Sequence, residues 1–76
     1  MKEVLETVIL NLVDDKDSVE IKQIDGEKLT TFEVKVAEKD MGRVIGKQGR
    51  LAKSIRTLMK AAATREHKRV SVEFIG

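Results

Sequence analysis

Two glycines separated by two residues lie within a basic stretch of the chain, Arg43-Val44-Ile45-Gly46-Lys47-Gln48-Gly49-Arg50. Glycine at positions 46 and 49 permits a sharp turn, and the missing side chains let another backbone approach closely. A helix that begins after this turn points its first N–H groups and the positive end of its dipole outward. Such groups bind phosphate. Lys47, with Arg43 and Arg50 about one turn to either side, adds charge-assisted contacts, so the segment predicts a phosphate site.

The spacing of the glycines excludes two other phosphate-binding motifs. A Walker loop requires Gly-x-x-x-x-Gly-Lys-Ser/Thr, whereas Gly42 and Gly46 enclose three residues and Gln48 follows Lys47. The dinucleotide fingerprint Gly-x-Gly-x-x-Gly fails because the glycine spacing is wrong and no strand leads directly into it. The pattern therefore favours neither a nucleotide hydrolase nor a dinucleotide-dependent enzyme.

The remaining residue types offer no catalytic centre. The 76-residue chain has no Cys and a single His, which excludes a disulfide scaffold, a Cys nucleophile and the usual structural zinc sites. His67 has no Ser or Cys partner at motif spacing. Asp14, Asp15 and Asp17 lack the glycine and terminal glutamate of a calcium loop, so they predict a solvated helix end. We expect no enzymatic activity, no metal and no cofactor.

The first half of the chain predicts a helix followed by a hairpin. Apolar residues recur with a helical period over 4–13. A strand is expected over 19–24, where the alternation slips at Ile24 and suggests a bulge. Asp25 and Gly26 begin a turn, and clean alternation over 30–36 predicts the second strand, with Phe32, Val34 and Val36 on one side.

The second half predicts two helices and a last strand. Asp40 is expected to cap a short helix over 41–45, which Gly46 ends. A longer helix from 49 or 50 to about 64 has an apolar face of Leu51, Ile55, Leu58, Met59 and Ala62. Its opposite face is basic, with Arg50, Lys53, Arg56 and Lys60. A strand over 70–74 completes the order αββααβ, and a crossover of this kind places it parallel to the middle strand.

Charge is distributed unevenly along the chain. Residues 1–38 carry five Lys and Arg against ten Asp and Glu, and residues 39–76 carry ten against three. This asymmetry favours a polyanionic partner, although lysines and arginines that merely solvate a helix are the alternative reading. Lys47 and Arg50 are expected to contact phosphate, and Arg56 and Lys60 to solvate the helix. No apolar run is long enough for a membrane span, so we expect a cytoplasmic protein that does not insert into membranes.

At this point the sequence resembles a known family. Val44-Ile45-Gly46-Lys47-Gln48-Gly49, with Leu51 downstream, matches the Val-Ile-Gly-x-x-Gly signature of KH domains. The order αββααβ resembles the type II arrangement. The stretch 40–49 and the acidic first helix resemble the small bacterial proteins of the KhpA family, over nearly the whole chain. The resemblance implies an α+β fold: one KH domain over 1–76, with a three-stranded mixed sheet and three helices on one face.

The resemblance also implies single-stranded RNA binding, with the Gly-x-x-Gly loop clamping the backbone of about four nucleotides. The residues expected to contact RNA are Arg43, Ile45, Gly46, Lys47, Gln48, Gly49, Arg50 and Lys53. Bases would lie across an aliphatic groove between the helices and the middle strand. Phe32 and Phe74, the only aromatic residues, are expected in the core, so no aromatic stacking platform is available.

Family resemblance further implies a homodimer and a heteromeric complex with a KhpB (Jag/EloR)-type RNA-binding protein. Roles in RNA chaperoning, post-transcriptional regulation, and cell elongation and division are implied in the same way. An alternative is a module that uses the KH fold to dimerise or to dock on another protein or the ribosome, with little RNA binding of its own. The cations of the loop, with no acidic residue inside it, weigh against this alternative.

Overall fold

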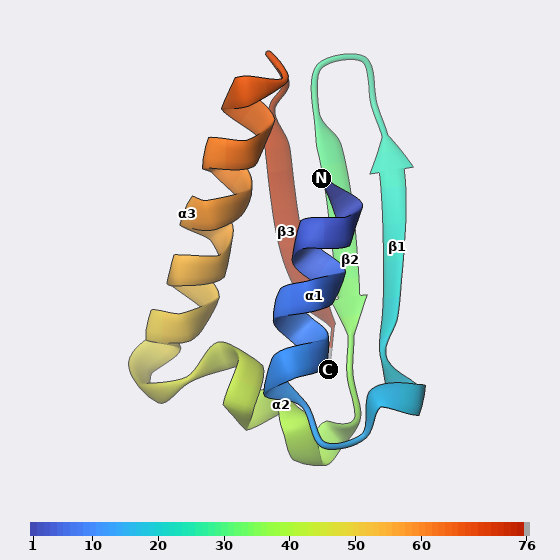
Figure 1. Cartoon of the computed structure of the whole chain (residues 1–76), viewed down its shortest axis with the longest axis vertical. Coiled ribbons are helices and arrows are strands. Elements are labelled where there is room, and N and C mark those ends of the chain that lie inside the picture. Colours follow the sequence, from blue (N-terminus) through green and yellow to red (C-terminus); the bar gives the residue numbers. More distant parts are fainter. Residues whose placement is uncertain (76) are drawn as a thin grey trace.

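The computed structural model describes residues 1–75 and has the element order that the hydropathy pattern predicts (Figure 1). Its helices and strands are α1 (Lys2–Leu12), the short 3₁₀ helix η1 (Lys16–Ser18), β1 (Glu20–Asp25), β2 (Thr30–Lys35), α2 (Glu38–Ile45), the 3₁₀ helix η2 (Lys47–Gly49), α3 (Arg50–Arg65) and β3 (Val70–Ile75). The predicted α+β fold with the order αββααβ is therefore confirmed.

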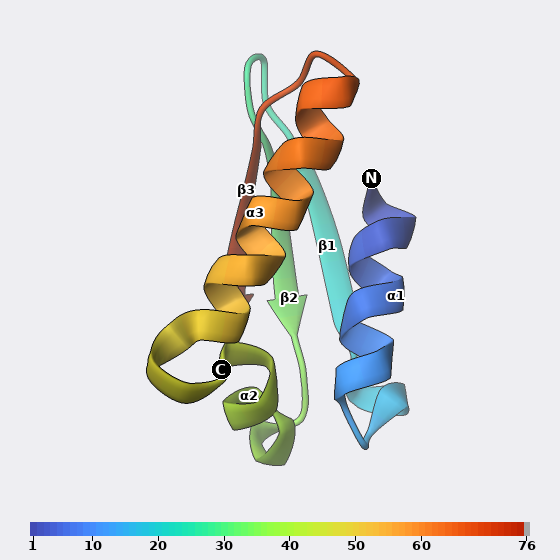
Figure 2. The ribbon, with the colours of Figure 1, turned by 60° about the vertical axis from the view of Figure 1, so that its left-hand side comes forward.

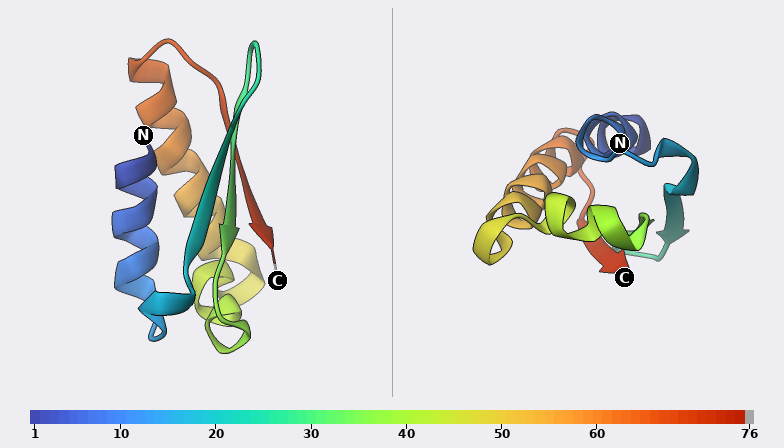
Figure 3. Two further views of the ribbon diagram at one scale, coloured as in Figure 1. Left: turned by 90° about the vertical axis from the view of Figure 1, so that its right-hand side faces the viewer. Right: turned by 90° about the horizontal axis from the view of Figure 1, so that it is seen from below.

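The three strands form one mixed sheet in the order β1-β2-β3. β1 pairs with β2 in antiparallel register, with Gln23 opposite Phe32, and β3 runs parallel to β2, with Phe32 opposite Val72. The parallel pairing confirms the predicted crossover. α1 and α3 lie over the same face of the sheet, and α2 lies beyond the end of β2 (Figure 3). No helix or loop of residues 1–75 covers the opposite face of the sheet, which we call the uncovered face.

The core lies between that sheet face and the helices. β2 contributes Phe32 and Val34, which are fully buried, and α1 contributes Leu5 and Ile9. Met59 of α3 completes the centre of this cluster. Every second residue of β2 and every third or fourth residue of each helix is buried, because these are the spacings at which side chains return to the same side. Packing thus fixes α3 against the sheet and, through it, the position of the turn that precedes α3.

Two apolar residues do not lie where the sequence places them. The register between β1 and β2 is unbroken from Glu20 to Asp25, so the predicted bulge at Ile24 is wrong. Ile24 points to the uncovered face and is 42% exposed, which explains the change of phase without an extra residue. Leu58 is 44% exposed rather than part of the buried face of α3. That face consists of Ala52, Ile55, Met59 and Ala63.

Asp40 has a different role from the predicted cap. α2 begins at Glu38, so Asp40 lies inside its first turn, and no side chain of residues 1–75 caps this helix. The Asp40 carboxylate is buried and accepts hydrogen bonds from the backbone N–H groups of Asp14 (3.1 Å) and Asp15 (3.0 Å). The bond from Asp15, reinforced by that from Asp14, holds the pKa of Asp40 below its ordinary value of 3.8, against the opposing effect of burial. Asp40 therefore ties α2 to the segment after α1.

Asp40→Asn is expected to lower the free energy of unfolding at pH 7, because the amide NH₂ places a donor against one of two backbone donors. A lowered folded-state pKa means that the carboxylate stabilises the protein above pH 3.8 and that this stabilisation is lost as the pH falls through the folded-state pKa. Urea unfolding measures the free energy of unfolding of wild type and variant at pH 7 and at about pH 3. The difference between the two proteins should be smaller at about pH 3 than at pH 7.

Asp17→Asn is the matched control, because Asp17 undergoes the same chemical change at an exposed position in η1. If Asp40→Asn lowers the free energy of unfolding at pH 7 no more than Asp17→Asn does, the role assigned to Asp40 is wrong.

Candidate nucleic-acid interface

The turn between α2 and α3, residues 46–49, lies at one end of the molecule. Figure 2 shows it as a projecting loop at the lower end of α3, away from the hairpin that joins β1 and β2. Gly46 ends α2, its N–H group bonding to the Gly42 carbonyl at 2.9 Å. η2 then leads directly into α3. The two helices thus present the glycine turn to solvent, as the sequence predicts.

The backbone of this turn explains why glycine occupies its two ends. Gly46 has φ 75° and ψ 178°, a conformation that side chains other than hydrogen essentially exclude. A Cβ on Gly46 would also lie 2.7 Å from Cβ of Leu51, at the start of α3. Gln48 (φ 56°) and Gly49 (φ 73°) are left-handed as well. Three of the four residues in the turn therefore have positive φ, and this lets the chain turn sharply between α2 and α3.

The backbone N–H groups at the start of the turn differ from those at its end in their hydrogen bonds. The N–H groups of Gly49 and Arg50 are bonded within it, to the carbonyl oxygens of Gly46 and Lys47. Among the turn and cap bonds of residues 1–75, none comes from the N–H groups of Lys47 and Gln48, the first two residues of η2. The sequence predicts open donors at the first residues of the long helix; η2 adds these two, which precede that helix. Paired N–H groups beside cationic side chains suit a phosphate oxygen.

The structure brings together most of the side chains predicted to contact RNA. Those of Lys47, Gln48, Arg50 and Lys53 are exposed, and they come from the turn and the first turn of α3. Ile45 is half-buried and packs against the core, so it supports the end of α2 and shows only part of its surface. No acidic residue lies between positions 41 and 65. The turn is consequently a cationic surface with a partly apolar base.

Arg43 is already engaged by another side chain. Its Nη1 donates a hydrogen bond to Oδ1 of Asp14 at 3.0 Å, and both side chains are more than half exposed. Exposed pairs of this kind stabilise little, so the guanidinium is available to a phosphate that competes with Asp14. Sequence reasoning could not find this partner, because Asp14 lies 29 positions away and no local pattern relates the two residues.

Arg56 was expected to solvate α3, and the structure corrects this expectation. Its Nε donates to the carbonyl oxygen of Val72 at 3.2 Å, and its guanidinium lies over the ring of Phe74, 5.4 Å from the centroid. Phe74 is only partly buried, and Arg56 covers its outer side. An arginine on the flank of a crossover helix can reach the free edge of the following parallel strand, but its spacing alone does not reveal this.

The αββααβ order, the mixed sheet and a Gly-x-x-Gly turn between the two consecutive helices define a type II KH domain. A family model described as "KhpA/KhpB, KH domain" matches residues 2–74. A protein named RNA-binding protein KhpA from Clostridium acetobutylicum is 56% identical over 75 residues, covering 99% of this chain and 100% of that protein. The chain belongs to the KhpA/KhpB family of KH domains.

More distant relatives have the same name. RNA-binding protein KhpA from Caldanaerobacter subterraneus subsp. tengcongensis is 55% identical, covering 99% of this chain and all of that protein. The protein of that name from Borreliella burgdorferi is 41% identical, covering 96% of this chain and 89% of its own length. No solved structure gave a significant match. Within residues 1–75, every helix is too short or too polar to span a bilayer.

Proposed function

We propose that this chain is a non-catalytic protein that binds single-stranded RNA, with the turn of residues 46–49 holding the RNA backbone. The observation that carries the proposal is the turn itself, where the N–H groups of Lys47 and Gln48 make no turn or cap bond within residues 1–75 and the side chains of Lys47 and Arg50 are exposed. The proposal is also supported by the relatives of similar length that are named RNA-binding proteins.

Contacts to phosphate position the RNA, and the bases lie on aliphatic side chains between the helices and the middle strand, beside the half-buried Ile45 and Leu51. Phosphate contacts carry no sequence information, and a KH loop clamps about four nucleotides. Phe32 is fully buried and Phe74 is covered by Arg56, so neither ring is free for a base to stack upon. We therefore expect modest affinity and low sequence specificity from one domain.

Binding to RNA should weaken steeply as salt rises, because each phosphate contact releases counterions. For single strands the slope of log K against log salt is about −0.7 per contact, so three or four contacts give about −2 to −3. Affinity should then fall roughly 20- to 50-fold between 50 and 200 mM salt. Fluorescence anisotropy with a labelled single-stranded RNA measures it. Binding that is feeble at every salt concentration contradicts the proposal and points to a KH fold used for docking on protein.

Membership in the KhpA/KhpB family supports a proposal for the wider role. We propose that the chain is a single domain over 1–76 that acts in the cytoplasm as an RNA chaperone or post-transcriptional regulator, linked to cell elongation and division. We also propose a homodimer and a complex with a KhpB (Jag/EloR)-type protein. The support is that one family description covers the KH domains of both KhpA and KhpB. Modest affinity from one domain also favours assembly, since linked domains bind RNA more tightly.

A further inference from the structure

A concave surface lies at the far end of α3, away from the turn. It is a groove of ≈ 300 Å³ between the last turns of α3, the start of β3 and the hairpin. Its apolar lining comes from Leu29, Ala63 and Val70, and its basic side chains include Lys60 and Arg69. We call these five residues the distal groove. Leu29 is 44% exposed although it is a large aliphatic residue, which leaves an apolar surface open to a ligand.

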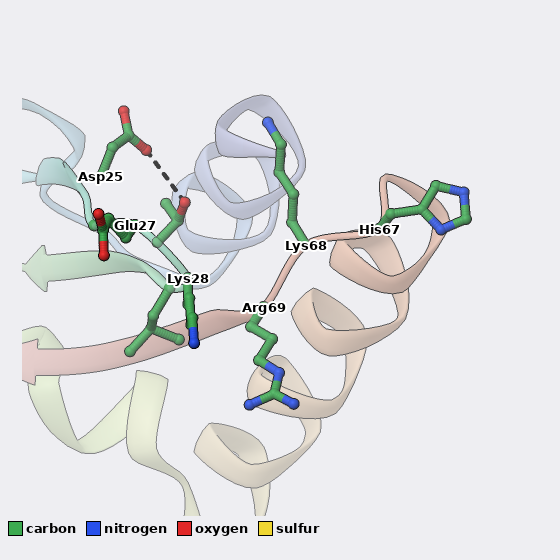
Figure 4. Close-up of a pocket in the computed structure, with 9 residues that line it drawn as sticks. Asp25, Glu27, Lys28, His67, Lys68 and Arg69 are labelled. Carbon is green, nitrogen blue, oxygen red and sulfur yellow. Dashed lines mark hydrogen bonds between the residues drawn. The ribbon is translucent and has the colours of Figure 1, made fainter.

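The charge of the distal groove is unbalanced. No acidic residue lines it, and within the described part of the chain neither Lys60 nor Arg69 forms an ion pair. Lys28 adds a further cation from an adjoining hollow, and within residues 1–75 it too forms no ion pair. In Figure 4 the side chains of Lys28 and Arg69 point to the same side of their loops, whereas His67 points away.

Two carboxylates lie nearby, in the adjoining hollow of ≈ 580 Å³. The Asp25 carboxylate accepts hydrogen bonds from Oγ1 of Thr30 (3.2 Å) and Nε2 of Gln23 (3.0 Å), which fixes it at the hairpin. Glu27 is exposed at the hairpin tip. Neither residue lines the distal groove, so the side of this region that attracts anions is the groove itself, between α3 and the start of β3.

Basic residues connect the distal groove to the turn. Lys53, Arg56 and Lys60 are spaced three and four apart, so they form one stripe along α3. Arg56 places this stripe along the free edge of β3, through its bond to Val72. The stripe begins near the turn and ends at the distal groove, whose helical residues lie in the last turns of α3. Figure 1 shows the hairpin that joins β1 and β2 at the end of α3 away from the turn. Sixteen helical residues separate the two ends by about 24 Å.

We propose that the distal groove binds a nucleotide of the same RNA strand that the turn holds, with the base on Leu29 and Val70 and the backbone phosphate on Lys60 and Arg69. This inference rests on the proposed function. An apolar floor beside unpaired cations matches a nucleotide, which has an apolar base face and an anionic phosphate. The turn already holds about four nucleotides, so a strand must extend beyond those four to occupy the distal groove as well, at the other end of α3.

The test compares two RNA lengths in two variants. Lys60→Gln with Arg69→Gln removes two charges from the distal groove, and Lys22→Gln with Lys35→Gln removes two from the uncovered sheet face. Labelled oligoadenylates of four and of twelve nucleotides are titrated by fluorescence anisotropy. The distal-groove variant should bind the longer RNA about tenfold more weakly, with a salt slope reduced by about 0.7, the loss of one phosphate contact. Its binding of the four-nucleotide RNA should equal that of the wild type, and the sheet-face variant should match the wild type on both.

The outcomes separate the two hypotheses. Wild-type protein that binds neither RNA overturns the proposed function, and this inference with it. If the wild type binds both RNAs and the distal-groove variant matches it on the longer one, only the distal groove is wrong. An equal loss in the sheet-face variant also overturns the inference, because it shows a dependence on net charge rather than on position.

Discussion

Replacing Lys47 and Gln48 together by aspartate is expected to weaken binding of single-stranded RNA roughly 100-fold at about 0.1 M salt. The change removes one cation and places two carboxylates where a phosphate would lie. The fold should persist, because both side chains are exposed and contribute nothing to the core. Gln48 has φ 56°, a left-handed conformation that aspartate tolerates better than most residues do. Circular dichroism checks the fold, and anisotropy with labelled RNA measures the affinity.

The chain supplies a chemically matched control for this variant. Lys22 and Gln23 form the same dipeptide in β1, and both are exposed. Lys22→Asp with Gln23→Asp changes the net charge equally, at a strand remote from the turn. It should retain most of the RNA affinity when the folded fraction is taken into account. Unchanged binding in the turn variant, or an equal loss in the strand variant, contradicts a phosphate site at the turn.

Gly46→Ala is expected to lower the free energy of unfolding by about 2–4 kcal/mol, although the substitution adds only one methyl group. Two costs add at this position. The conformation of Gly46 is one that only glycine adopts readily, and the new Cβ would meet Leu51 Cβ at 2.7 Å and Leu51 N at 3.1 Å. Leu51 cannot retreat freely because α3 is fixed by its buried face. Urea unfolding followed by circular dichroism gives the free energy of both proteins.

Gly49→Ala separates backbone conformation from crowding. Gly49 has φ 73° and ψ 14°, and an added Cβ would have no atom within 4 Å outside its chain neighbours. Only the left-handed conformation is penalised there, at about 1–2 kcal/mol. The Gly46 variant should therefore be less stable than the Gly49 variant. Equal losses, or a greater loss at Gly49, mean that Gly46 is not held against the start of α3 as described.

Local sequence patterns were enough to predict the helices, the strands and the glycine turn of residues 46–49. Alternation in β2 predicts which side of the strand is buried, and the helical period does the same for α1, because both depend on neighbours a few residues away. The glycines at 46 and 49 likewise report a local conformation, and the structure gives both of them positive φ. The Gly-x-x-Gly spacing between two helices was thus visible without coordinates.

Contacts between distant parts of the chain could not be predicted in this way. Asp40 has a residue type and a position that suit a helix cap, yet its carboxylate bonds to backbone groups 25 and 26 positions away. Arg43 and Arg56 likewise have partners that only the packing of α2 and α3 brings near. The predicted bulge at Ile24 is wrong because, in the sequence alone, an exposed isoleucine on the uncovered face looks like a shift of register.

The most direct test of the central claim is an NMR titration of ¹⁵N-labelled protein with the four-nucleotide RNA. If the turn holds the RNA backbone, the amide signals of Lys47 and Gln48 should shift most, with those of neighbouring residues in the turn and early α3, and the shifts should reverse as salt is added. Amides on the uncovered face of the sheet, such as those of Lys22 and Glu73, should stay in place. Shifts confined to that face, with the turn unmoved, would contradict the account.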